Sequence, residues 1–152
     1  RRWDIYKESF EDPAHFERYL DQTAGTLAVV AARALGDADE QVVRDAAYGA
    51  AVAAWLLAIP ALENAGRVPL LDGTPAAVAR LAQGGLDRLA KARNARRNVS
   101  AQAGAALLHV GAAVPVLKAA IADPQAVAEG VLPDPVETDR FGLAYRGLTG
   151  RW

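Results

Sequence analysis

Apolar residues return every three or four positions through most of the chain, which is the period of an α-helix. Between an N-cap signal at Asp12-Pro13 and a terminating glycine at Gly36, one such stripe is formed by Phe16, Leu20, Leu27, Val30 and Leu35. The pattern predicts one helix here, with the stripe facing the core. No alternating apolar and polar run of strand length occurs, so we expect an all-α fold.

Several further helices are predicted from their start and stop signals. Asp37 with Glu40 three residues later resembles a capping box for a second helix, which Pro60 kinks or ends. After a loop over residues 64–73, Thr74-Pro75 caps a third helix, in which Gly84-Gly85 predict a kink or a close helix contact. We expect a fourth helix over residues 99–122 with Pro115 inside it, a short fifth helix after Asp123-Pro124, and a last one around residues 137–148.

The chain is long enough for one domain with a substantial core. It has 152 residues, of which 52% are hydrophobic, and neither a repeat nor a low-complexity linker divides it. We therefore expect a single domain over residues 1–152. Alanine and glycine let helix backbones approach closely but bury little area each. The core should depend on many tight contacts, with Trp3, Trp55 and Trp152 as the bulky exceptions.

Charge and composition exclude several classes of function. A net charge of −1 gives no overall field that would draw the protein to nucleic acid, and the absence of cysteine excludes disulfides and cysteine-based zinc sites. Two uncharged runs, residues 46–62 and 98–117, are rich in Ala and Gly, which predicts buried core helices and no transmembrane segment. The absence of cysteine also fits a reducing compartment, and we expect a cytoplasmic protein. The chain opens RRWDIYKESF without methionine, and we interpret it as N-terminally incomplete.

Few side chains form a chemical constellation. The basic cluster of Arg88, Lys91, Arg93, Arg96 and Arg97 is expected to be the solvated end of a helix. A diphosphate, a nucleic-acid backbone or an acidic partner is the alternative for this cluster. His109 lies among Ala, Leu and Val and is expected in the core. Acidic residues are scattered, and their spacing predicts no metal site.

Two segments carry a family resemblance. The first is Tyr19-Leu-Asp-Gln-Thr-Ala-Gly-Thr-Leu-Ala28, and the second is Tyr48-Gly49-x-Ala51, an apolar run and then Gly66-Arg67-Val-Pro-Leu70. They resemble the Y-x-x-x-V-A-G-x-V-G helix and the G-x-A-x-Q-L-x-N-I-L-R-D-x-x-E-D…G-R-x-Y-L-P segment of the squalene/phytoene synthase family. Thr23 stands in place of the valine and Ala28 in place of the last glycine. The resemblance extends over residues 10–150.

The resemblance implies an isoprenoid-synthase-like helical bundle around a central cavity, of which this chain is the C-terminal part. In that family two aspartate-rich motifs hold Mg²⁺, which binds the diphosphates of two prenyl substrates. For this sequence the resemblance implies substrate-binding roles for Tyr19, Gly25, Tyr48, Glu63 and Arg67, with Tyr19 and Gly25 lining the cavity and Arg67 meeting an anion. The implied ligand is a prenyl diphosphate or another lipid, with peripheral contact to a membrane.

The sequence departs from the family where the chemistry is done. The D-x-x-E-D motif should fall near residues 59–64, which read Ile-Pro-Ala-Leu-Glu-Asn, and only Glu63 is acidic. The other acidic motif would lie before residue 1. One carboxylate cannot replace three as ligands for Mg²⁺, so we expect impaired or lost catalysis. The family also contains divergent members that are associated with assembly of respiratory complex I and share the fold without evident synthase chemistry. This sequence resembles those members more than the synthases.

Three hypotheses follow. The first is a divergent squalene/phytoene synthase-like protein that has lost catalysis and binds a prenyl lipid or serves as an assembly factor. The second is an active Mg²⁺-dependent prenyl transferase that uses ligands upstream of this chain together with Glu63. The third is an unrelated helical interaction domain with a protein partner.

Overall fold

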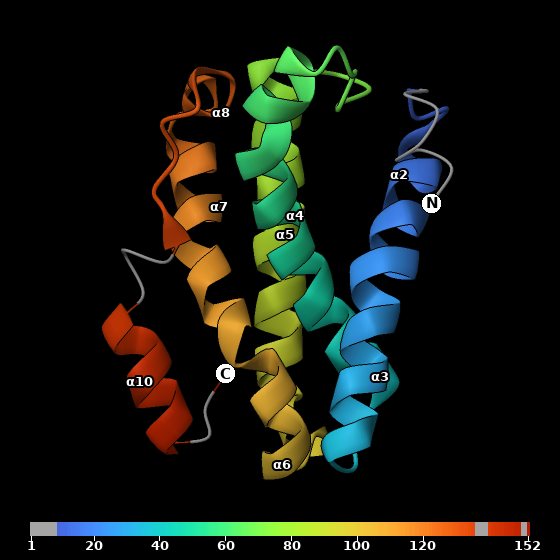
Figure 1. Ribbon diagram of the computed structural model, residues 1–152, viewed down its shortest axis with the longest axis vertical. Coiled ribbons are helices and arrows are strands. Elements are labelled where there is room, and N and C mark those ends of the chain that lie inside the picture. The colour runs from blue at the N-terminus through green and yellow to red at the C-terminus, as the bar shows by residue number, and fades with distance from the viewer. Residues whose placement is uncertain (1–8, 136–139, 150–151) are drawn as a thin grey trace.

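The all-α prediction is confirmed by the computed structural model, which describes residues 9–135, 140–149 and 152. Two long antiparallel helices lie at the centre, the N-terminal helices flank them on one side, and the C-terminal helices flank them on the other (Figure 1). Along the chain the elements are α2 (Pro13–Leu20), η1 (Asp21–Gly25), α3 (Thr26–Leu35), α4 (Glu40–Asn64), α5 (Pro75–Asn94), η2 (Arg96–Asn98), α6 (Ala101–Gly104), η3 (Ala105–Ala112), α7 (Ala113–Ala122), α8 (Gln125–Glu129) and α10 (Arg140–Thr149).

Most helix starts agree with the predicted signals. Asp12 caps α2 by accepting from the His15 N–H at 2.6 Å, and Thr74 caps α5. The cap predicted at Asp37 is wrong by two residues. Asp39, not Asp37, caps α4, because residues 37 and 38 pair instead with the chain before α6: the Ser100 N–H donates to the Asp37 carbonyl at 2.8 Å. The helix also runs through Pro60 to Asn64, so it does not end at the proline.

A turn of π-helix, η1, interrupts the first predicted helix and changes the side that faces the core. A π-turn adds about one residue to a helical turn. Within this segment the buried residues are therefore Phe16, Leu20, Gly25, Val29 and Ala32. The second half of the predicted stripe is wrong for this reason, since Leu27, Val30 and Leu35 are 70%, 61% and 51% exposed. As a result, α3 carries apolar side chains on its outer face as well as its inner one.

The central helices α4 and α5 are in contact at glycines. A Cβ placed on Gly49 would meet the Leu89 side chain and lie 2.7 Å from the Gly85 carbonyl oxygen. A Cβ on Gly85 would lie 3.2 Å from Leu117 of α7, whereas one on Gly84 would meet nothing within 4 Å. Of the two outcomes predicted for the Gly84-Gly85 pair, the close helix contact is therefore the one observed, and α5 is continuous.

The fourth predicted helix is divided into α6, η3 and α7, and it begins after Ser100 rather than at residue 99. In η3 the 3₁₀ geometry repeats every three residues, which buries Leu107 and Val110 and leaves His109 exposed. The prediction that His109 lies in the core is therefore wrong. Pro115 sits in the first turn of α7, where its missing N–H is tolerated. The start predicted for the last helix lies outside the described residues, as does Trp3.

Two described stretches, α4 and Ala101–Ala122, are long and apolar enough to cross a membrane. Core helices of soluble proteins meet the same criterion. In α4, 56% of the most apolar window is buried in the bundle, against 39% in the second stretch. The interpretation of both as core helices stays a prediction.

The contact between α4 and α5 leads to a stability prediction with an internal control. Gly49→Ala should lower the free energy of unfolding by about 1–3 kcal/mol, because the new methyl overpacks the helix contact. Gly84→Ala should raise it by up to about 1 kcal/mol, because alanine favours the helix and open space surrounds the position. Urea unfolding measures both, and equal effects of the two substitutions would contradict the close contact.

Candidate functional site

A pocket of ≈ 220 Å³ lies where α4 ends, and it contains two of the residues singled out in the sequence. Glu63 and Arg67 are its charged lining residues. Its other walls come from the end of α4, the loop that follows, the start of α5, and α8: Ile59, Val68, Pro69, Leu70, Gly73, Val78, Pro124, Val127 and Ala128. We call this the Arg67 pocket. It places one cation and one carboxylate among lining residues whose other side chains are apolar.

The backbone at the end of α4 positions Arg67. Gly66 adopts a left-handed conformation with φ 73°, which other residues rarely adopt. The Gly66 N–H donates to the Glu63 carbonyl at 2.8 Å, and the Arg67 N–H donates to the Leu62 carbonyl at 3.0 Å. This is the Schellman pattern of a helix C-terminus. It turns the chain back so that Arg67 lies over the last turn of α4, close to Glu63.

Trp55 connects the loop that lines the pocket to α4 and to an aromatic cluster. Its buried indole Nε1–H donates to the Pro69 carbonyl at 3.1 Å, which holds the loop against α4. The same ring system also contacts Phe10, Phe16 and Tyr19 in an aromatic cluster. Tyr19 lies in this cluster, with its ring centroid 5.5 Å from that of Trp55. Tyr19 therefore does not line the Arg67 pocket but contacts the residue that holds its loop.

Gly25 lies in η1, beneath an ion pair. The Asp21 carboxylate accepts from Arg44 Nη1 at 2.7 Å, and a Cβ on Gly25 would lie 2.7 Å from the same Asp21 oxygen. Arg44 Nε also donates to the Glu40 carboxylate at 2.9 Å, and hydrogen bonding to Arg44 is the main cause that lowers the pKa of Glu40. Because Gly25 has no Cβ, it leaves room for the Asp21–Arg44 ion pair, which connects η1 to α4. It does not line the Arg67 pocket.

Tyr48 is also remote from that pocket. It is 8% exposed, and the Arg88 guanidinium of α5 lies over its ring, 4.1 Å from the centroid. Burial raises the pKa of the Tyr48 phenol, Glu17 adds to the rise, and Arg88 opposes it. The phenol is therefore neutral at physiological pH.

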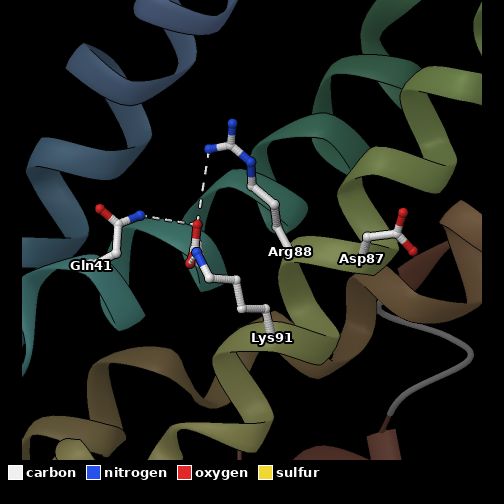
Figure 2. A pocket seen from close by; sticks show the side chains of 5 residues that line it. Gln41, Asp87, Arg88 and Lys91 are labelled. Atoms are coloured by element: carbon white, nitrogen blue, oxygen red, sulfur yellow. Dashed lines mark hydrogen bonds and ion pairs between the residues drawn. The ribbon is translucent and has the colours of Figure 1, made fainter.

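A second pocket, of ≈ 370 Å³, lies between α4 and α5 (Figure 2). It is lined by Gln41, Asp45, Asp87, Arg88 and Lys91, and we call it the Arg88 pocket. Asp45 is 3% exposed; its carboxylate is 2.7 Å from Lys91 Nζ and accepts from Gln41 Nε2 at 3.1 Å. Neither charge nor spacing in the sequence predicts a functional role for Asp45. The one indication of its burial is that it precedes Gly49 by four residues, which places both on the same buried face of α4.

The basic cluster is only partly the solvated helix end that the sequence predicts. Arg96 and Arg97 are exposed, in agreement with the prediction. Lys91 is exposed as well, although its Nζ pairs with Asp45, whereas Arg88 is half-buried and lies over the Tyr48 ring. Arg93 is half-buried, and burial lowers the pKa of its guanidinium, with a further contribution from nearby Arg146.

The residues of the Arg67 pocket do not fit the magnesium site of the resembled family. Mg²⁺ is held through carboxylates and substrate phosphates, and Glu63 is the one carboxylate among the lining residues. Nor does any group of three or more His, Cys, Asp or Glu side chains suited to a metal ion occur within the part of the chain that the structure describes. The central cavity implied by the resemblance stays a prediction.

The structural role of Gly25 is testable by a double-mutant cycle. Gly25→Ala should displace the Asp21 carboxylate and weaken its pair with Arg44. The substitution should therefore cost about 0.5–1 kcal/mol more in the wild-type chain than in an Asp21→Ala background, as expected for groups in contact. Chemical denaturation of the four proteins measures this coupling. Equal costs in both backgrounds would mean that Gly25 is not there to accommodate the ion pair.

Comparisons with known proteins do not add to this picture. Neither a protein-family model, nor a curated protein, nor a solved structure matches the chain.

Proposed function

We propose that the protein is a divergent squalene/phytoene synthase-like protein that binds a prenyl diphosphate, or a related anionic lipid, without efficient catalysis. The observation that carries this proposal is the convergence of Glu63 and Arg67 in one pocket with apolar walls. Both positions are also among those for which the resemblance implies a substrate-binding role, and the two lie on either side of the end of α4. A ligand with a charged head and a hydrocarbon tail matches this combination.

The guanidinium of Arg67 supplies the head-group interaction. A guanidinium presents a planar fork of N–H donors that suits phosphate oxygens, and such charge-assisted bonds are among the stronger ones in proteins. The aliphatic walls from α5 and α8 would contact the first part of the prenyl chain. At ≈ 220 Å³ the pocket is smaller than the ~300–1,000 Å³ of most ligand sites. We therefore expect the remainder of the chain to extend along exposed Val68 and Leu71 at its edge.

Loss of catalysis follows from the charge available in the pocket. A diphosphate leaves only when its negative charge is neutralised, which metal ions ordinarily do in such reactions. Arg67 supplies one positive charge and Glu63 offsets it. Ionisation of the ligand should therefore be slow, while binding of the intact ligand is retained.

A second candidate function, that of an assembly factor or interaction domain, is favoured by the outer face of α3. Leu27, Val30 and Leu35 leave this ten-residue helix apolar on both sides. A helix that is apolar all round is ordinarily covered on all sides. A protein partner that covers this face would be compatible with ligand binding at the Arg67 pocket, because α3 does not line it.

The head-group contact is tested by titration calorimetry with farnesyl or geranylgeranyl diphosphate. Arg67→Gln should weaken binding about ten- to a hundredfold, since a hydrogen bond to a charged group contributes about 1.5–3 kcal/mol. Arg80→Gln is the matched control, because Arg80 lies on neighbouring α5, its closest acid is Asp72 at 3.9 Å, and it does not line the pocket. An equal loss in both variants would contradict a specific head-group site.

Diphosphate release with Mg²⁺ separates the remaining alternatives. Binding without release supports the proposal. Release that disappears in Glu63→Ala would show an active prenyl transferase, and the inference of lost catalysis would be wrong. Absence of binding in the wild-type protein would reject the lipid-binding function and leave the interaction domain.

A further inference from the structure

The Arg88 pocket is separate from the site proposed above. Asp45 and Glu63 are 18 residues apart on α4, which corresponds to about 27 Å along a helix that rises 1.5 Å per residue. A single prenyl diphosphate head group cannot occupy both pockets. The Arg88 pocket therefore needs its own explanation.

Arg88 is held in place by packing and not by hydrogen bonds. Its guanidinium stacks on the buried Tyr48 ring at 4.1 Å, and its nearest carboxylates are those of Glu17 at 3.6 Å and Asp45 at 4.0 Å. Both distances exceed those of hydrogen bonds. Within the part of the chain that the structure describes, Arg88 makes no hydrogen bond, so its planar donors are oriented but not used.

The other polar groups of the pocket already have hydrogen-bond or ion-pair partners, which leaves the Arg88 guanidinium as the group with unused donors. Lys91 forms an ion pair with the buried Asp45 carboxylate, and Gln41 donates a hydrogen bond to it. Asp87 points away from the other side chains, and its carboxylate accepts from Gln83 at 2.8 Å (Figure 2). Arg88 and Lys91 balance the two carboxylates of the lining, Asp45 and Asp87, so an anion would be attracted by the unused donors of Arg88 and not by an excess of charge. Glu17, on α2, competes only through an exposed pair, which contributes little.

From this geometry we infer that the Arg88 pocket is a binding site for a phosphate group, either inorganic phosphate or a phosphomonoester. Arg88 would bind two phosphate oxygens through its fork, and the Lys91 ammonium would contact a third while it remains near Asp45. Tyr48 acts as a positioning residue, because its ring fixes the plane of the guanidinium. Arginine suits this role better than lysine because its donors lie in one plane.

The test is a titration of the whole chain with inorganic phosphate, followed by calorimetry and by the NMR signal of the Arg88 Nε–Hε group. We expect saturable binding with a Kd on the order of 1 mM. Arg88→Lys keeps the charge but loses the fork, and it should weaken binding at least about tenfold. Arg80→Lys on the same helix is the matched control and should leave the affinity unchanged.

Several outcomes would overturn the inference. They are no saturation at phosphate concentrations of about 50 mM, equal affinity in Arg88→Lys, and an Arg88 signal that phosphate does not move in the wild-type protein. The last measurement decides the question even if Arg88→Lys does not fold.

Arg67→Gln should leave phosphate affinity unchanged. If it abolishes that affinity, phosphate binds in the Arg67 pocket, which overturns this inference without weighing against prenyl diphosphate binding. A phosphomonoester that binds at least tenfold more tightly than phosphate would identify the natural source of the group.

Discussion

The close approach of α4 and α5 at Gly49 and Gly85 is the constraint on which the rest of the structure depends. With no side chain at either position, the two backbones and Leu89 come into direct contact, and Val52 and Leu117 close the space around them. This fixes the register of α5 on α4, which in turn brings Arg88 over Tyr48 and Lys91 to Asp45. The same pair of helices carries the Arg67 pocket at its other end, where the loop between them returns past Trp55. Both candidate sites are therefore consequences of one helix pairing.

A one-residue change in helical phase explains the other main feature, the apolar outer face of α3. The stripe predicted from spacing is correct for Phe16 and Leu20 and fails after η1. That failure has a physical cause, because the π-turn is held by contacts that spacing does not contain. Thr23 donates to the Tyr19 carbonyl at 2.7 Å, and Asp21 binds Arg44, which is 23 residues away. A pattern that assumes 3.6 residues per turn throughout cannot register this change. The same assumption fails at η3. Its helical period is three residues per turn, and this geometry leaves the His109 side chain exposed.

The predictability of the sites follows the same division between local and long-range contacts. Helix caps at Asp12 and Thr74 depend on neighbouring residues, and sequence signals located them correctly. Glu63 and Arg67 converge because a helix end and a left-handed glycine between them suffice to bring them together. The Arg88 pocket, in contrast, needs α4 and α5 in register, so neither the buried Asp45 nor the stacking of Arg88 was predictable from spacing. Tyr48 was singled out through the resemblance, but its contact with Arg88 could be found only in three dimensions.

The most direct test of the account is a map of where a prenyl diphosphate contacts the folded chain. Backbone and methyl NMR spectra recorded during a titration with geranylgeranyl diphosphate would supply it. The account predicts signal changes at Glu63 to Leu70, Val78 and Val127, with Tyr48 and the outer face of α3 unaffected. Changes confined to Leu27, Val30 and Leu35, or no change at any signal, would contradict a ligand pocket at the end of α4.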